Sequence, residues 1–184
     1  MAVAIEVTID DLAFRSALQP MRDAGADLSP ALRAIGEAMV TSTRLRFASG
    51  TGPDGAKWKP SKRALKEGGQ TLVLSRRLES SIMANATSSL VEWGTNVIYA
   101  AIHQLGGVIN RAAGSHTIYR KAGKDGIAPR FVKKRQSNFA QDVAHKAFNI
   151  KIPARPFLGV DVADQVTITD ILTRHLAKAL GGAA

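Results

Sequence analysis

The side chains best suited to acid–base or metal chemistry in this chain are its histidines, and their spacing favours neither. No two of them stand at the separation that zinc ligands need. Cysteine is absent, which excludes disulfides and thiolate metal sites and is typical of a protein made in a reducing compartment. The chain has no HExxH, GxSxG or phosphate-binding GxxxxGKS/T motif. We therefore expect no metal and no cofactor. The four histidines are His103, His116, His145 and His175.

His103 is the histidine with the most suggestive surroundings. It follows Tyr99 by four positions and precedes Gln104 and a pair of glycines. A general base needs a carboxylate to orient it, and the candidates are Glu92, which is the nearest acid in sequence, and Asp161. The alternative is that His103 forms hydrogen bonds that fix the end of a helix to the adjoining loop. We expect the structural role and no enzymatic activity.

Trp58 lies between two lysines in the sequence KWKP. Cations beside an aromatic side chain are compatible with stacking on a nucleic-acid base. They are equally compatible with a buried indole whose flanking lysine stems cover it. A base-stacking surface interleaves several aromatics with basic residues, whereas aromatics make up only 5% of this chain. The composition favours a buried Trp58.

Positive charge is concentrated between Arg111 and Lys151. This stretch holds ten of the 25 lysines and arginines but two of the 15 acids, and so carries +8 of the net charge of +10. Such a segment binds nucleic acid or an acidic partner, or is simply a solvated surface loop. The side chains expected to contact DNA or an acidic partner are Arg120, Lys121, Lys124, Arg130, Lys133, Lys134 and Arg135.

Hydrophobic periodicity predicts the elements of the first half of the chain. Alternating apolar residues predict a strand at 3–9, and a helix follows over 10–24. A second helix is predicted from 29 to about 47, with Ser29 as its N-cap and with Ser49 and Gly50 ending it. Glycine and proline predict a tight turn at 52–55.

The next segments are predicted to be shorter. Residues 60–74 are polar and predicted to be irregular, and a short helix is expected at 75–80. Two short segments at 81–87 and 90–94, joined by a tight link at Ser88 and Ser89, predict a hairpin, and a helix over 98–105 precedes the glycine pair.

The last third contains the basic stretch and a final helix. Within the basic stretch, we expect residues 116–121 to form a hairpin with residues 127–133. Prolines keep residues 152–158 extended, and apolar spacing predicts an amphipathic helix over 164–180. No apolar run approaches the ~18 residues that span a bilayer, and the N-terminus lacks the pattern of a secretory signal.

Four sequence stretches together resemble a known family. They are RF followed by GPDGAKWKP, LSRRL followed by SI, WGTNVIYAAIHQLGG, and IPARPFLGVD. In this order and spacing they resemble the phage virion morphogenesis family, the tail-completion proteins of Mu-like and P2-like phages and prophages. The resemblance covers roughly residues 28–180, and its specific parts are GTNxxYAAIHQxGG and ARPFLG. Arg76 and Arg77 stand where the family usually has a glycine.

The resemblance implies a fold, a role and partners. The fold is α+β, with helices packed on a small, mostly antiparallel sheet as in tail terminators. The length of 184 residues itself predicts a single domain (1–184). Residues 108–150, about which the resemblance says least, are expected to form a basic insertion or arm within it. The role is that of a structural protein that completes or terminates the tail and joins it to the head. The resemblance also implies a ring of six copies at the neck, in contact with the tail tube protein and the head–tail connector or adaptor protein. Assembly would take place in the host cytoplasm, without a membrane, a cofactor or enzyme activity.

The same motifs supply the residues expected at interfaces or in structural motifs. Arg155 offers a forked hydrogen-bond donor, and Phe157 and Leu158 offer apolar anchors for a neighbouring subunit. The alternative is an internal connection with Phe157 in the core. The basic arm would contact genomic DNA weakly in the lumen of the ring or bind an acidic face, and the alternative function is a nucleic-acid-binding module over 111–151. The full set is Trp58, Tyr99, His103, Gln104, Arg155, Pro156, Phe157 and Leu158.

Overall fold

The computed structural model describes residues 16, 19, 27–124 and 126–181. The strand predicted at 3–9 lies outside the described residues, as does the helix predicted over 10–24 apart from Ser16 and Gln19, which are helical. The chain divides into two compact units. The first unit combines Met1–Gly106 with Pro153–Ala184, and the second unit is Gly107–Ile152.

Helix α2 (Ser29–Ser49) is the central element of the first unit. Its N-cap is Leu28, so the prediction of Ser29 as N-cap was wrong by one position. Leu28 has no side chain that can accept a hydrogen bond, and the Asp27 carboxylate accepts one from the Ser29 amide instead, at 2.9 Å. The helix ends as predicted, because Gly50 adopts the left-handed conformation that closes a helix C-terminus.

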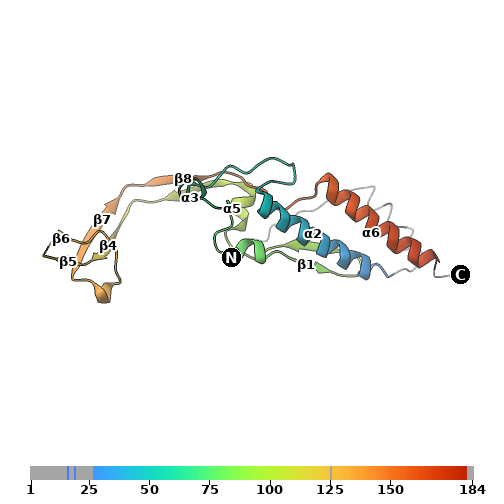
Figure 1. The fold of residues 1–184 in the computed structure, drawn as a ribbon, viewed down its shortest axis with the longest axis horizontal. Helices are drawn as coiled ribbons and strands as arrows, with labels where there is room; N and C mark the ends of the chain where they lie inside the picture. The colour runs from blue at the N-terminus through green and yellow to red at the C-terminus, as the bar shows by residue number, and fades with distance from the viewer. Residues whose placement is uncertain (1–15, 17–18, 20–26, 125, 182–184) are drawn as a thin grey trace. The chain divides into compact units, whose positions relative to one another are not determined.

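Helix α2 packs against helix α6 (Val162–Gly181) and against a hairpin of two short strands. Figure 1 shows α2 and α6 running side by side in opposite directions. A β-carbon on Gly36 of α2 would lie 2.9 Å from the Ala84 Cβ, so only glycine allows the helix to approach the hairpin this closely. Helix α6 was predicted to begin at Asp164 and begins two residues earlier.

The hairpin pairs β1 (Met83–Ala86) with β2 (Val91–Gly94) in the antiparallel arrangement predicted. Apolar side chains from α2 and α6 form one hydrophobic cluster, against which Val91 and Trp93 of the hairpin pack. The buried members of this cluster are Leu28, Ala31, Leu32, Ile35, Met39 and Leu172.

Three short helices lie between these elements. Helix α3 (Lys62–Glu67) corrects the prediction that 60–74 is irregular, because the Ser61 hydroxyl caps its first turn by accepting from the Ala64 amide at 3.1 Å. Helix α4 (Arg77–Ser80) and helix α5 (Ala100–Leu105) lie where short helices were predicted. They contribute to a second hydrophobic cluster, whose buried members are Phe47, Trp58, Leu78, Ile82, Val97, Ala100, Phe157 and Leu158.

The second unit consists of paired strands. Strand β3 (Gly107–Arg111) pairs with β8 (Phe148–Ile152), and β4 (Gly114–Arg120) pairs with β7 (Phe139–His145). The predicted ladder between 116–121 and 127–133 was wrong, since β4 forms its ladder with β7. Two backbone hydrogen bonds do join the predicted segments, from the Ala128 amide to the Lys121 carbonyl and from the Val132 amide to the Tyr119 carbonyl. Pro129 lies in the predicted partner strand and cannot donate to a ladder, whereas 139–145 can pair along its whole length.

Two smaller elements complete the second unit. Strands β5 (Ala122–Gly123) and β6 (Gly126–Ile127) form a two-residue ladder, and a single 3₁₀ turn, η1 (Lys134–Gln136), precedes β7. Every strand pair of the described residues is antiparallel, and the helices pack beside small sheets, so the predicted α+β class is confirmed.

Candidate functional site: an anchored loop in the first unit

The most densely bonded part of the first unit is residues 153–161, which we call the anchored loop. It contains the ARPFLG motif and leads into α6. Phe157 is fully buried and Leu158 is 3% exposed. Of the two roles considered for these side chains, the structure supports the internal connection. Phe157 presents no surface to a neighbouring subunit because it lies in the core of its own.

Gln104 holds the middle of the anchored loop. Its side-chain oxygen accepts hydrogen bonds from the amides of Phe157 and Leu158 at 2.9 and 3.0 Å. Its side-chain nitrogen donates to the Leu158 carbonyl at 2.9 Å. One glutamine side chain therefore satisfies three backbone groups of a loop that has no strand partner. This contact gives a structural reason why the chain carries both the IHQ sequence and the PFL sequence.

Trp58 and Arg155 fasten the start of the loop. The Trp58 indole donates to the Pro156 carbonyl at 2.9 Å, and its aromatic ring packs edge-on against Phe47 at a centroid distance of 5.5 Å. Trp58 is buried, so its ring is not placed to stack on a nucleic-acid base. Arg155 donates from Nε to the Lys59 carbonyl at 2.7 Å and from its amide to the His103 carbonyl at 2.7 Å.

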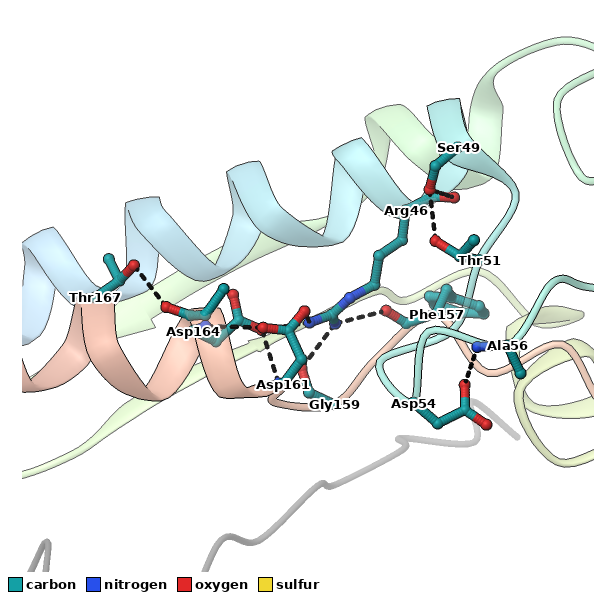
Figure 2. Close-up of polar contacts among 11 residues, drawn as sticks. Arg46, Ser49, Thr51, Asp54, Ala56, Phe157, Gly159, Asp161, Asp164 and Thr167 are labelled. Carbon is teal, nitrogen blue, oxygen red and sulfur yellow. Dashed lines mark hydrogen bonds and ion pairs between the residues drawn. The ribbon is translucent and has the colours of Figure 1, made fainter.

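Arg46 binds the end of the loop, as Figure 2 shows. Its guanidinium donates to the Gly159 carbonyl at 2.8 Å and to the Phe157 carbonyl at 3.2 Å. It also forms ion pairs with Asp161 at 3.0 Å and with Asp164. Arg46 is 4% exposed, so these charge-assisted hydrogen bonds form away from solvent, where they are strongest and where their loss costs most.

The two aspartates also cap helix α6. The Asp164 amide donates to the Asp161 carboxylate at 2.8 Å, and the Asp161 amide donates to the Asp164 carboxylate at 3.1 Å. This reciprocal pattern is a capping box at the start of the helix. Burial alone raises the pKa of Asp161, but hydrogen bonds from Asp164, Arg46 and Ala163 and the charge of Arg46 outweigh it, so the pKa lies below its usual value.

The predicted turn at 52–55 packs closely against the anchored loop. The Gly55 amide donates to the Gly52 carbonyl at 3.0 Å, which closes the turn. A β-carbon on Gly52 would lie 3.3 Å from the Pro156 carbonyl oxygen, and one on Gly159 would lie 2.7 Å from the Pro53 ring. The approach of the two segments therefore needs glycine at position 159, where φ is +150°, whereas the contact at Gly52 is close but less strict.

A shallow cavity of about 300 Å³ lies beside α5, and Tyr99, His103 and Arg155 form part of its wall. Leu72, which lines the cavity, and Arg76, which stands between the lining residues Ser75 and Arg77, are non-glycine residues with left-handed backbones, at φ of 65° and 56°. Such strain persists only where the surrounding structure imposes it, and it is common at binding sites. The remaining lining residues are Ser61, Arg63, Leu72, Leu74, Ser75, Arg77 and Leu78.

His103 has no carboxylate partner among the described residues. Its Nδ1 is buried without a hydrogen bond, while Asp161 is occupied by Arg46 and the α6 cap. Burial and, to a lesser extent, the nearby charge of Arg155 lower the pKa of His103, so its side chain is neutral at pH 7. The arrangement supplies the loop contact through the His103 carbonyl and no orienting group for a general base.

The basic residues predicted to meet DNA or an acidic partner lie in the second unit. Arg120 ends β4, and Lys121, Arg130 and Lys133 line a hollow that is described below. Lys134 and Arg135 lie in η1, and Lys124 lies between β5 and β6. In the described part of the chain, no group of three His, Asp or Glu side chains could hold a metal ion, and no helix is long and apolar enough to cross a membrane.

Arg46 and Asp164 are the two key residues that sequence reasoning missed. The Arg46-Phe47 pair belongs to one of the motifs, but the sequence placed Arg46 on a helix without a partner. Its partners lie 111 to 118 positions away. The available signal was an arginine one position before a buried aromatic, together with two aspartates spaced for a helix cap.

Comparison with known proteins gives one match. A sequence model described as the phage virion morphogenesis family matches residues 9–177. The match confirms the resemblance seen in the four motifs and extends it toward the N-terminus. No curated protein and no solved structure matches the chain significantly.

Proposed function

Because the chain belongs to the phage virion morphogenesis family, we propose that it completes the phage tail and joins it to the head as a subunit of a ring at the neck. The observation that carries this proposal is the family match over residues 9–177, which spans both units. The family is one of structural proteins that build the virion, and a role in virion assembly follows directly from membership. The ring of six, the position at the neck and the contacts with the tail tube and connector proteins are our proposal.

A surface suited to contact between copies surrounds helix α5. Ile98 is 78% exposed, Leu105 is 72% exposed and Leu74 is 76% exposed, and all three belong to motifs of the family resemblance. Tyr99 is exposed beside them. Leu74 and Tyr99 line one cavity, while Ile98 shortly precedes helix α5 in sequence and Leu105 ends it. We assign these exposed apolar side chains to contact with a second copy of this chain, because a closed ring needs a heterologous contact on every subunit.

The anchored loop makes this surface rigid. Gln104 and the His103 carbonyl tie α5 to Arg155, Phe157 and Leu158, which are themselves buried. A contact surface that is already fixed before assembly loses less conformational entropy when two subunits meet. Thus the buried motif residues support the interface indirectly, by holding the exposed ones in place, and need not cross it themselves.

An aspartate at position 98 tests the proposed contact. We expect Ile98→Asp to fold normally, since the side chain is exposed, and to reduce the number of copies in purified particles at least about tenfold, because a buried carboxylate without a partner costs several kcal/mol. Complementation of a phage lacking this chain, followed by quantitative mass spectrometry of the particles, measures the effect.

The matched control is Val162→Asp on helix α6. Val162 is 77% exposed, as Ile98 is, but lies outside the α5 surface. Incorporation should be close to wild type for Val162→Asp. Equal incorporation of both variants, or equal loss of both, would contradict the assignment of the contact to α5.

A nucleic-acid-binding module is the second candidate function. The charge of the second unit favours it, since ten of the chain's 25 lysines and arginines lie there. This candidate does not compete with a structural role, because a virion protein can also touch the genome.

A further inference from the structure

The positive charge of the second unit has almost no counter-charge. Asp142 is the one acid among its described residues, and it accepts a hydrogen bond from the Thr117 hydroxyl at 2.6 Å on the β4–β7 ladder. The ion pairs found among the described residues all lie in the first unit. The cations of the second unit are therefore free to bind an anionic partner, and every one of its described residues is at least partly exposed.

Three of these cations surround one hollow. Lys121, Arg130 and Lys133 line a concavity of about 650 Å³, and none of the described residues in its wall is acidic. The rest of the wall is Ala128, Phe131, Val132 and Gln136. Three positive groups that converge on one space without a carboxylate favour a ligand that carries several negative charges close together.

Backbone hydrogen bonds fix the positions of the segments that form the wall of the hollow. The Ala128 amide donates to the Lys121 carbonyl at 2.8 Å, and the Val132 amide donates to the Tyr119 carbonyl at 2.9 Å. At the far end of the same segment, the Gln136 amide donates to the Lys133 carbonyl at 2.8 Å. The segment that carries Arg130 and Lys133 is thus held against the strand that carries Lys121, so the three charges are positioned by the fold.

Arg120 adds a fourth cation at the rim. Its guanidinium lies 5.0 Å from the centre of the Phe131 aromatic ring, and its Nε is buried without a hydrogen-bond partner. Phe131 is 62% exposed, but Arg120 occupies one of its faces. The aromatic side chain consequently orients a charge rather than offering a free platform for base stacking.

The chemistry of the hollow favours DNA over an acidic protein. An acidic protein partner would need apolar anchors that become fully buried at the centre of the interface. Phe131 and Val132 are the large apolar side chains of the hollow, and the Arg120 guanidinium already covers one face of the Phe131 ring. Duplex DNA needs no such anchor, since its phosphates follow one another at about 1.7 Å along the axis and bind lysine and arginine without regard to sequence.

We propose that the hollow lined by Lys121, Arg130 and Lys133 is a phosphate-binding site for the backbone of double-stranded DNA. Binding is weak, independent of base sequence and dependent on the release of counterions. The inference stands on the second unit alone and does not depend on the subunit ring. It selects three of the seven basic side chains that the sequence predicted to contact DNA or an acidic partner, and it chooses DNA as the partner.

Titration of the full chain into a fluorescently labelled duplex of about 30 base pairs, between about 50 and 300 mM salt, tests the site. The test variant is the triple substitution Lys121→Ala/Arg130→Ala/Lys133→Ala. The control, Arg33→Ala/Lys66→Ala/Lys178→Ala, removes the same charge from exposed positions of the first unit. Near-ultraviolet circular dichroism establishes that both variants are folded.

The expected result has two parts. Wild-type affinity falls steeply with salt, and the test variant lowers the slope of log K against log salt by about 3, because each phosphate contact contributes about 0.9. Affinity of the test variant at the lowest salt falls at least about tenfold, while the control stays within about threefold of wild type.

Three results would overturn the proposal. They are equal slopes for the test and control variants, wild-type binding that does not depend on salt, and tighter binding to polyglutamate than to DNA, which would assign the hollow to an acidic protein. Incorporation of the triple variant into particles is measured separately. Loss of DNA binding with normal incorporation distinguishes this site from the proposed assembly function.

Discussion

Replacing Arg46 with methionine is expected to lower the free energy of unfolding by about 3–5 kcal/mol. Methionine fills a similar volume but leaves the buried carboxylate of Asp164, which is 4% exposed, without its cation. The carbonyls of Phe157 and Gly159 also lose their donor. Urea denaturation followed by tryptophan fluorescence measures the change, since Trp58 and Trp93 both lie in or against the hydrophobic clusters.

Two further variants separate the ion pair from general effects on the helix. Arg33→Met changes an exposed arginine of the same helix and should shift stability by less than about 0.5 kcal/mol. Arg46→Met combined with Asp164→Asn should recover part of the loss, because the second change removes the unpaired charge. A loss for Arg46→Met no larger than that for Arg33→Met would show that the buried ion pair does not hold the anchored loop.

Truncating Phe157 to alanine is expected to cost about 3–5 kcal/mol. The side chain is fully buried and lies 5.2 Å from Phe47 between aromatic ring centres, so its removal leaves a cavity in the cluster that also contains Trp58. Phe157→Leu should cost less, since leucine fills part of the space. Thermal and urea denaturation measure both changes.

The exposed apolar residues provide the comparison for Phe157. Ile98→Ala should leave the free energy of unfolding within about 0.5 kcal/mol of wild type, because its side chain already meets solvent in the isolated chain. A Phe157→Ala protein as stable as Ile98→Ala would mean that Phe157 is not in the core. It would restore the alternative that this side chain anchors a neighbouring subunit.

Local patterns in the sequence predicted much of the first unit. The end of α2 at Gly50, the turn at 52–55 and the β1–β2 hairpin each depend on residues within a few positions of one another. Glycine, proline and apolar spacing carry that information directly. Helix α3 was missed because its one clear signal, the Ser61 cap, stands in a polar stretch without an apolar face.

Contacts between distant residues could not be predicted in the same way. Strand β4 pairs with β7, and Thr117 and Asp142, which face each other on this ladder, are 25 positions apart. The nearer segment 127–133 looks equally extended in sequence. Register between distant strands depends on the whole ladder and not on a local turn, so proximity in sequence favoured the wrong partner.

The candidate site likewise combines features that local sequence patterns predicted with contacts that they could not predict. The motifs identified Gln104, Arg155 and Phe157 as important, but their sequence left open whether they face a neighbour or their own core. In the structure Gln104 accepts from the Phe157 amide and Arg155 donates to the Lys59 carbonyl, all within the first unit. Ile98 and Leu105, which belong to the same motif as Gln104, are exposed. The motif thus combines two requirements, internal anchoring and an exposed surface, that a sequence pattern cannot distinguish.

The central claim is that this chain is a structural component at the neck of a phage particle. A cryo-electron microscopy reconstruction of the neck of the mature particle tests it most directly. We predict a closed ring of copies at the head-proximal end of the tail, with the α5 surface of each copy against its neighbour. Neck density into which no copy of this chain fits, in particles that also lack the chain by mass spectrometry, would contradict the claim.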